Sequence, residues 1–143
     1  MKIKKKLIIG LTTVMIPLIL GALLYYIICP EVFFVKLIDR YTDFNIHIEY
    51  QTEQNRVTEI FRNYFFDFIW AFAFTNALNL IFNNDTIAHL KGCFISVVVG
   101  ALFEVLQLVR VVYGTFDVWD ILSEILGTVC AFFIMMVIRR KKV

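Results

Sequence analysis

The sequence predicts an all-α integral membrane protein with four transmembrane helices and both termini in the cytoplasm. The 143-residue chain is 60% hydrophobic and has a mean hydropathy of +0.77, which is too apolar for a soluble domain of this size. Long apolar stretches are separated by polar connections, and basic residues gather at the two ends, each beside an apolar stretch. We therefore expect one membrane domain over residues 1–143, with the lipid bilayer as its main partner and no nucleic-acid partner.

The first apolar stretch, residues 7–28, has no charged side chain and is long enough to cross the ~30 Å hydrocarbon core as a helix. Pro17 is expected to kink this helix, which is tolerable in lipid. A cleaved signal peptide is the competing interpretation of a basic start followed by an apolar run. The apolar part is too long for one, and no small-residue cleavage site follows at Tyr25–Cys29. We expect a retained span.

Residues 31–62 are expected to form an extracytoplasmic loop, because they mix acidic, basic and apolar side chains. From Val32 to Tyr41 the loop has the amphipathic pattern of a short helix on the membrane surface. Residues 44–51 alternate apolar and polar side chains like a half-buried strand. A solvated loop is the alternative there, since a single strand has no partner with which to pair.

Three further spans are expected, at residues 64–82, 93–112 and 119–138. A turn and a short link over residues 83–92 join the first two of these. Both histidines, His47 and His89, are expected in connecting segments, so no zinc site is predicted. Gly114 lies in a tight turn, where its freedom to adopt a positive φ makes the last two spans antiparallel neighbours.

The basic tails set the expected orientation, because positively charged flanks stay in the cytoplasm. Four basic residues in the loop of residues 31–62 oppose this orientation, but the tails outnumber them and lie directly beside spans. The tails contain Lys2, Lys4, Lys5, Lys6, Arg139, Arg140, Lys141 and Lys142. Cys29 is then expected at the outer face, Cys93 at the inner face and Cys130 in mid-span, so all three should be free thiols.

Ionisable groups inside apolar spans are expensive and are kept mostly for function, so they mark the candidate site. From the helical rise, the ionisable groups of three different spans are all expected in the outer half of the bundle. On each of the last two spans these groups share one face of the helix, and the two faces are expected to lie opposite each other. The outward-facing polar site is expected to bind a ligand through Glu104, Gln107, Asp120 and Glu124, with Asp67, Arg110 and Asp117 at its mouth.

Several of these residues also have structural interpretations. Asp117 is a good N-cap, and Asp120 in the first turn would favour the helix dipole. Arg110 would reach the headgroups by snorkelling. Asn76, Asn79 and Gln107 are expected to form interhelical hydrogen bonds.

The charge balance limits what the site can do. With every carboxylate ionised against Arg110, the site would carry about −4, so the carboxylates must take up protons, bind a cation or hold a cationic part of a ligand. Their spacing matches no established metal cage, and no nucleophile-elbow, P-loop or HExxH pattern occurs. We expect no metal and no cofactor.

Two motifs resemble the signature of VanZ-like proteins, which are small helical membrane proteins of bacteria. The motifs are Glu104-x-x-Gln107 and, after a short turn, Asp117-x-x-Asp120 with Gly127; the stretch of residues 63–70 is also similar to the start of that domain. The resemblance covers about residues 60–138. This chain diverges where the family has an Arg before the acidic pair, here Gly114-Thr115, and an Asn after it, here Glu124.

The resemblance implies a bacterial cytoplasmic (inner) membrane and a role in the cell envelope, since the family's namesake is associated with low-level resistance to the glycopeptide teicoplanin. The leading hypothesis is a non-enzymatic protein that binds or senses an envelope component, such as a lipid-linked or peptidoglycan-related ligand. One alternative is a membrane enzyme that acts on a lipid-linked substrate through a pair of carboxylates. Another is a structural subunit of a membrane complex. A proton-coupled carrier is disfavoured, because the inner halves of the last two spans contain no ionisable residue.

Overall fold

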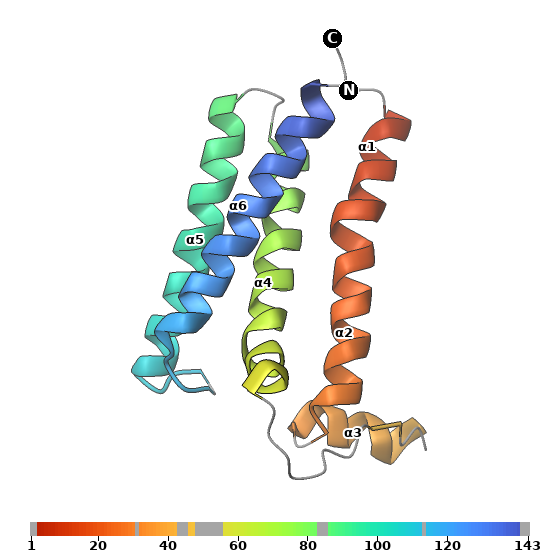
Figure 1. Ribbon diagram of the computed structural model, residues 1–143, viewed down its shortest axis with the longest axis vertical. Coiled ribbons are helices and arrows are strands. Elements are labelled where there is room, and N and C mark those ends of the chain that lie inside the picture. Colours follow the sequence, from red (N-terminus) through yellow and green to blue (C-terminus); the bar gives the residue numbers. More distant parts are fainter. Residues whose placement is uncertain are drawn as a thin grey trace.

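The computed structural model describes residues 3–30, 32–42, 46–47, 56–82, 86–112 and 114–140, and all regular structure in these residues is helical. The elements are α1 (Ile3–Gly10), the π-helical turn η1 (Leu11–Met15), α2 (Ile16–Ile28), α3 (Phe33–Thr42), α4 (Arg56–Ile81), α5 (Thr86–Leu108) and α6 (Val118–Arg140). The long helices run side by side (Figure 1). The predicted all-α class is confirmed.

Four helices in this part of the chain are long and apolar enough to cross a membrane: Ile3–Ile28, Asn63–Ile81, Ile87–Leu108 and Val118–Ile138. The start of α1, the end of α4, the start of α5 and the end of α6 lie at one end of the bundle, which is the upper end in Figure 1. The helix α3 lies across the opposite end. This arrangement indicates a multi-pass membrane protein with α3 at one surface.

The first span remains helical through Pro17, which comes second in α2. A proline has no N–H to donate and its ring crowds the carbonyl group one turn earlier, so an α-helix cannot continue through it unchanged. Here the chain forms one π-helical turn, in which the N–H of Ile16 donates to the oxygen of Leu11. The wider turn accommodates the proline without a break in the span.

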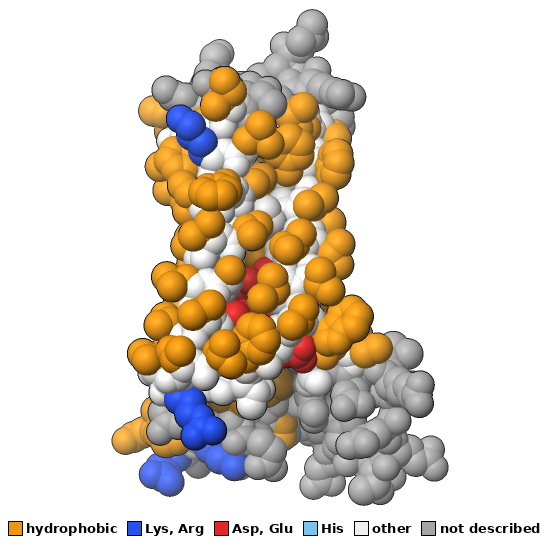
Figure 2. Space-filling model, turned by 90° about the vertical axis from the view of Figure 1, so that its left-hand side faces the viewer, with side chains coloured by type: hydrophobic (Ala, Val, Ile, Leu, Met, Phe, Trp, Pro, Cys, Tyr) orange, Lys and Arg blue, Asp and Glu red, His pale blue; other side chains and the backbone are white. Residues whose placement is uncertain are grey.

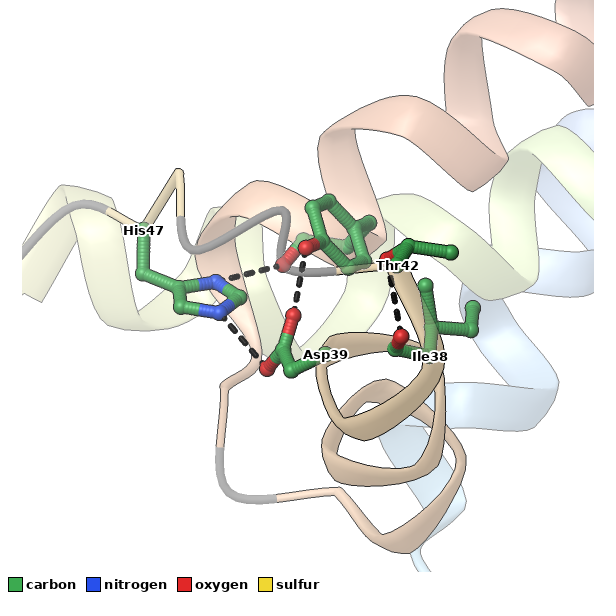
Figure 3. A network of polar contacts seen from close by, with 5 residues as sticks. Ile38, Asp39, Thr42 and His47 are labelled. Atoms are coloured by element: carbon green, nitrogen blue, oxygen red, sulfur yellow. Dashed lines mark hydrogen bonds and ion pairs between the residues drawn. The ribbon is translucent and has the colours of Figure 1, made fainter.

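The helix α3 is amphipathic, as the sequence predicts. Val35 is buried, whereas the charged side chains of Lys36 and Arg40 are exposed. Phe33 and Phe34 are also exposed, at the end of the bundle. A polar network fastens α3 to the end of α2 (Figure 3): the hydroxyl of Tyr26 donates to Asp39, and the Nε2 atom of His47 lies 2.9 Å from the other carboxylate oxygen.

The hydrogen bond from Tyr26 is the largest influence on Asp39 and lowers the pKa of its carboxyl, with a further lowering from His47. Of the strand-like segment at residues 44–51, the structure describes Ile46 and His47 alone, and these two lie in no helix or strand. His47 lies in a connecting segment, as expected.

The interior of the bundle is polar and its surface is apolar, the reverse of a soluble protein. The fully buried side chains include Thr75, Asn76, Asn79 and His89, each with 0% exposure. Large apolar side chains cover the outside along all four spans, and Figure 2 shows them over one long face with Lys and Arg near its two ends. Helices in lipid gain little from burying leucine but do gain from close packing and hydrogen bonds, so this inversion supports a bilayer environment.

The helix α4 packs against α2, α5 and α6. Its closest approach is to α6 at Gly127, where an added Cβ would lie 2.3 Å from the carbonyl oxygen of Phe68. Only glycine lets the two backbones meet at this distance. The resulting contact holds the faces of α4, α5 and α6 around one shared interior.

Several helix boundaries differ from the predicted ones. The helix α4 begins at Arg56, so the last part of the segment predicted as a loop, residues 31–62, is helical. The helix α5 begins at Thr86 rather than Cys93, so His89 lies inside this helix and the prediction that it occupies a connecting segment is wrong. Within this stretch His89 is fully buried in the bundle interior, whereas Lys91 is exposed. At its other end α5 stops at Leu108 rather than Val112, because Arg110 adopts a left-handed conformation with φ of 61°.

Candidate functional site

The acidic side chains of three helices meet in one cavity in the half of the bundle nearer α3. The cavity has a volume of about 240 Å³ and is lined by Asp67, Trp70, Phe103, Glu104, Gln107 and Glu124. Asp67 and Trp70 of α4 are three positions apart, as are Glu104 and Gln107 of α5, so each pair shares one face of its helix, and α6 contributes Glu124. Acidic side chains are visible part-way along the otherwise apolar face in Figure 2, so the cluster can be reached from the side of the bundle.

Glu104 ties α5 to the beginning of α6. The residue is only 5% exposed, and its Oε2 atom accepts a hydrogen bond from the backbone N–H of Asp117 at 3.1 Å. This contact crosses the short connection between the two helices. Glu104 therefore lines the cavity and also holds the beginning of α6 beside α5.

Glu124 lies deeper between the helices and is 7% exposed. Its carboxylate is pressed against Gly100 of α5, where an added Cβ would lie 1.8 Å from Oε2. No described residue forms a hydrogen bond or ion pair with the Glu124 side chain. A carboxylate buried to this degree without a partner is costly, which points to a role in binding.

Asp117 caps α6, as one of its two interpretations predicts. Its carboxylate accepts hydrogen bonds from the N–H of Trp119 at 2.9 Å and from the hydroxyl of Tyr64 at 3.2 Å. Asp120 is half-buried in the first turn of the helix and interacts electrostatically with Asp67, Glu104 and Asp117. These two acids flank the cavity rather than line it.

Arg110 is the predicted site residue whose surroundings differ most from the expected ones. Its side chain is exposed, and it forms no ion pair with any described residue. Its backbone closes α5: the N–H of Arg110 donates to Gln107 at 2.9 Å and the N–H of Val111 to Leu106 at 2.9 Å. This is the Schellman pattern, with arginine in the position that usually holds glycine.

Gly114 has a φ of +143°, as its place in the turn predicts, and it packs against Gln107, whose Cδ atom would lie 2.6 Å from an added Cβ. The turn thus sets the position of the Gln107 amide beside the cavity. The structure brings Asp67, Glu104, Gln107 and Glu124 together, with Asp117 and Asp120 nearby.

The chain matches no protein-family model, no curated protein and no solved structure. Its function must therefore be argued from the site.

The cavity differs from a metal centre. Among the described residues, no three His, Cys, Asp or Glu side chains are placed so that they could hold a metal ion. The carboxylates surround a space far larger than the ~10–15 Å³ that a single water molecule needs. This arrangement suits a polyatomic ligand better than a bare cation.

The aromatic residues that line the cavity were not predicted from the sequence. Trp70 and Phe103 meet edge to face, with ring centroids 6.3 Å apart. With 15 Phe, 6 Tyr and 2 Trp in the chain, an aromatic residue in a span carries almost no positional signal. The cysteines were predicted to form no disulfide, and none joins Cys29, Cys93 and Cys130 in the structure.

Proposed function

We propose that this protein is a VanZ-like, non-enzymatic protein of a bacterial cytoplasmic membrane that binds the cationic headgroup of a lipid-linked envelope component. The observation that carries the proposal is the carboxylate of Glu124, which is 7% exposed, lines the cavity and has no partner among the described residues. Glu104 and Asp67 line the same space. A ligand that carries an amine would satisfy all of these groups at once.

The balance of charge favours a cationic ligand over an anionic or neutral one. Arg110, the one basic residue predicted at the site, forms no ion pair with any described residue, so the acids have no internal counterion there. Trp70 and Phe103 line the same cavity and would favour such a ligand, because ammonium groups are attracted to aromatic rings by about 0.5–2 kcal/mol.

A second space beside Trp70 fits the apolar part of such a ligand. Trp70 also lines an apolar groove of about 330 Å³ between α2, α3 and α4, together with residues such as Gly21, Phe34 and Ile69. The acidic cavity and this groove therefore share one side chain as a wall. A ligand whose headgroup binds in the cavity would place its apolar part in this groove, beside the headgroup.

The orientation of the bundle follows from its basic tails, which the positive-inside rule places in the cytoplasm. The end with α3 then faces outward, and the cavity opens within the outer half of the bilayer. This is where an envelope component would meet it. The motifs at Glu104 and Asp117 support a VanZ-like protein, and with it a role in glycopeptide tolerance.

Trp70 provides a built-in reporter of binding. The chain has 2 tryptophans, so Trp119→Phe leaves Trp70 as the only one. A brominated long-chain alkylamine is titrated against this variant in detergent micelles, and quenching of Trp70 fluorescence is measured. The matched probe is a brominated alcohol of the same chain length, which shares the apolar part but has no charge.

We expect saturable quenching by the amine and at least tenfold weaker quenching by the alcohol, a difference of about 1.4 kcal/mol. The double change Glu104→Gln and Glu124→Gln should remove this preference for the amine. The change Asp39→Asn, at an acid outside the cavity, should leave it intact. Equal quenching by both probes, or an unaltered preference in the double variant, would refute the proposal.

A further inference from the structure

The half of the bundle away from α3 contains a line of buried polar groups that begins at the acidic cavity. On α5 the buried face carries a polar or glycine residue at every third or fourth position. In order toward the start of the helix these are Glu104, Gly100, Ser96, Gly92 and His89. Residues at this spacing lie above one another, about 5–6 Å apart. Polar groups therefore run along the interior for most of the length of α5.

Three hydroxyl groups join the helices directly inward of the cavity. Thr75 of α4 donates to Thr128 of α6 at 3.3 Å, and Thr128 donates to Ser96 of α5 at 3.3 Å. All three side chains are no more than 3% exposed. Thr128 lies one helical turn from Glu124, so the hydroxyl chain starts next to the unpartnered carboxylate.

Beyond the hydroxyl groups lie two buried amides with unsatisfied polar atoms. Among the described residues, neither polar atom of Asn79 has a hydrogen-bond partner, and the Oδ1 atom of Asn76 has none, while its Nδ2 atom donates to Phe72 of its own helix. The prediction that these two amides form interhelical hydrogen bonds is therefore wrong for the described part of the chain. Asn79 fills the space left by Gly92, where an added Cβ would lie 2.6 Å from its Oδ1 atom. Buried polar atoms of this kind are normally satisfied by ordered water, so this region is suited to hold it.

His89 lies at the far end of the line, one turn from Gly92 on the same face of α5, and is 0% exposed. From His89 to Glu104 the helix rises about 22 Å, which is most of the ~30 Å hydrocarbon core. An imidazole can take up and release protons near neutral pH. The line thus has a titratable group at each end.

We propose that this line, from Glu124 to Thr128, through its two hydroxyl neighbours Thr75 and Ser96, and past Asn79 to His89, conducts protons between the acidic cavity and the end of the bundle where α5 begins. Each hydroxyl group has one exchangeable proton and two lone pairs, so it can accept a proton on one side as it releases its own on the other. After the proton has passed and the hydroxyl groups have rotated back, each hydroxyl group is neutral again.

This activity goes beyond the proposed ligand binding and does not depend on it. The absence of ionisable residues from the inner halves of the last two spans does not oppose it, because relay needs hydroxyl groups, amides and water rather than charges. Interhelical hydrogen bonds that only hold the helices together would not require buried amide atoms without a partner beside them.

The test is proton flux through the full chain in liposomes. A potassium gradient with valinomycin imposes a membrane potential, and a pH-sensitive dye inside the vesicles measures proton entry. The key variant is Thr128→Val, which keeps the shape but removes the central hydroxyl. Thr128→Ser restores that hydroxyl. The matched control is Thr12→Val, since Thr12 is exposed and donates only to the backbone of its own helix.

We expect wild-type flux well above that of protein-free vesicles, a fall of at least tenfold in Thr128→Val, recovery in Thr128→Ser and no change in Thr12→Val. If Thr128→Val does not fold, Ser96→Ala interrupts the same chain and should show the same fall. Wild-type flux equal to that of empty vesicles would overturn the proposal. Flux that survives both Thr128→Val and Ser96→Ala would also overturn it. Neither result would affect the amine-binding test.

Discussion

Replacement of Gly127 by alanine tests whether the close contact of α4 with α6 holds the bundle together. An added Cβ would lie 2.3 Å from the carbonyl oxygen of Phe68 and 3.1 Å from the backbone nitrogen of Phe72. Ordinary C···O contacts are about 3.3–3.6 Å, so the helices must separate by roughly 1 Å. No side-chain rotation can relieve the overlap, because both obstacles are backbone atoms.

The expected loss of stability is about 3 kcal/mol. Overpacking costs about 1–3 kcal/mol, and a backbone obstacle places this site at the upper limit. Separation also weakens two interhelical hydrogen bonds, from Ser123 to the oxygen of Tyr64 at 2.5 Å and from Thr75 to Thr128 at 3.3 Å. Such bonds contribute about 0.6 kcal/mol each in membranes. The higher helix propensity of alanine offsets this loss of stability by about 1 kcal/mol.

The assay is equilibrium unfolding by a denaturing detergent in mixed micelles, followed by helical circular dichroism. Gly10→Ala is the matched control, because its nearest atom would be the flexible Cδ1 of Leu80 at 3.4 Å. We expect this control to be as stable as wild type or up to about 1 kcal/mol more stable. Gly127→Ala with the stability of wild type would refute the proposed contact between α4 and α6.

Three further changes probe other parts of the chain. Arg110→Gly should stabilise the protein by about 0.5–1 kcal/mol in the same unfolding assay, because glycine adopts the left-handed conformation without strain; a loss of stability would contradict this. Because its partners lower the pKa of Asp39, the stability from this carboxylate is complete above the ordinary value of 3.8 and is lost as the pH falls through the lower value of the folded state. Hydrogen exchange in α3 should therefore accelerate only in strongly acid solution, and Asp39→Asn should remove that dependence. Gly100→Ala should displace the carboxylate of Glu124 and weaken binding of the brominated amine at least tenfold, and unchanged binding would exclude Glu124 from the site.

The sequence was sufficient for the helical class and for the number of candidate spans, because hydropathy over twenty residues is a strong signal. It was insufficient for the start of α5. The residues from Thr86 to Gly92 include His89 and Lys91, and polar residues next to a turn indicate a connecting segment in most proteins. In this bundle His89 faces a polar interior, so the usual association of polarity with exposure is reversed.

The carboxylates of the cavity could be predicted because their positions follow from helical spacing. Glu104 and Gln107 share a face of α5, and the turn at Gly114 brings α6 beside it. The position of Arg110 could not be predicted in the same way, because it depends on one backbone angle. A non-glycine residue with positive φ has no reliable signature in the sequence, and this angle ends α5 and leaves the arginine exposed.

The unsatisfied amides and the hydroxyl chain could not be predicted from the sequence, for a different reason. Thr75, Ser96 and Thr128 belong to three helices, and their contact depends on how deeply α4 and α6 approach each other at Gly127. Small residues in a span favour close packing in general. They do not specify which hydroxyl groups meet.

The most direct measurement is the labelling of single-cysteine variants in intact cells with a membrane-impermeant thiol reagent, because the proposed site requires the end with α3 to face outward. Cys29 ends α2 beside α3. Cys93 was expected at the inner face, but it lies inside the span Ile87–Leu108 and is partly buried, so an exposed position at the start of α1, Lys5→Cys in a chain without other cysteines, reports on the opposite end. We expect intact cells to label the variant that retains Cys29, and the Lys5→Cys variant to react only after the membrane is permeabilised. Labelling of Lys5→Cys without Cys29 in intact cells would place the acidic cavity in the cytoplasmic half of the membrane and contradict its role in binding an outer envelope component.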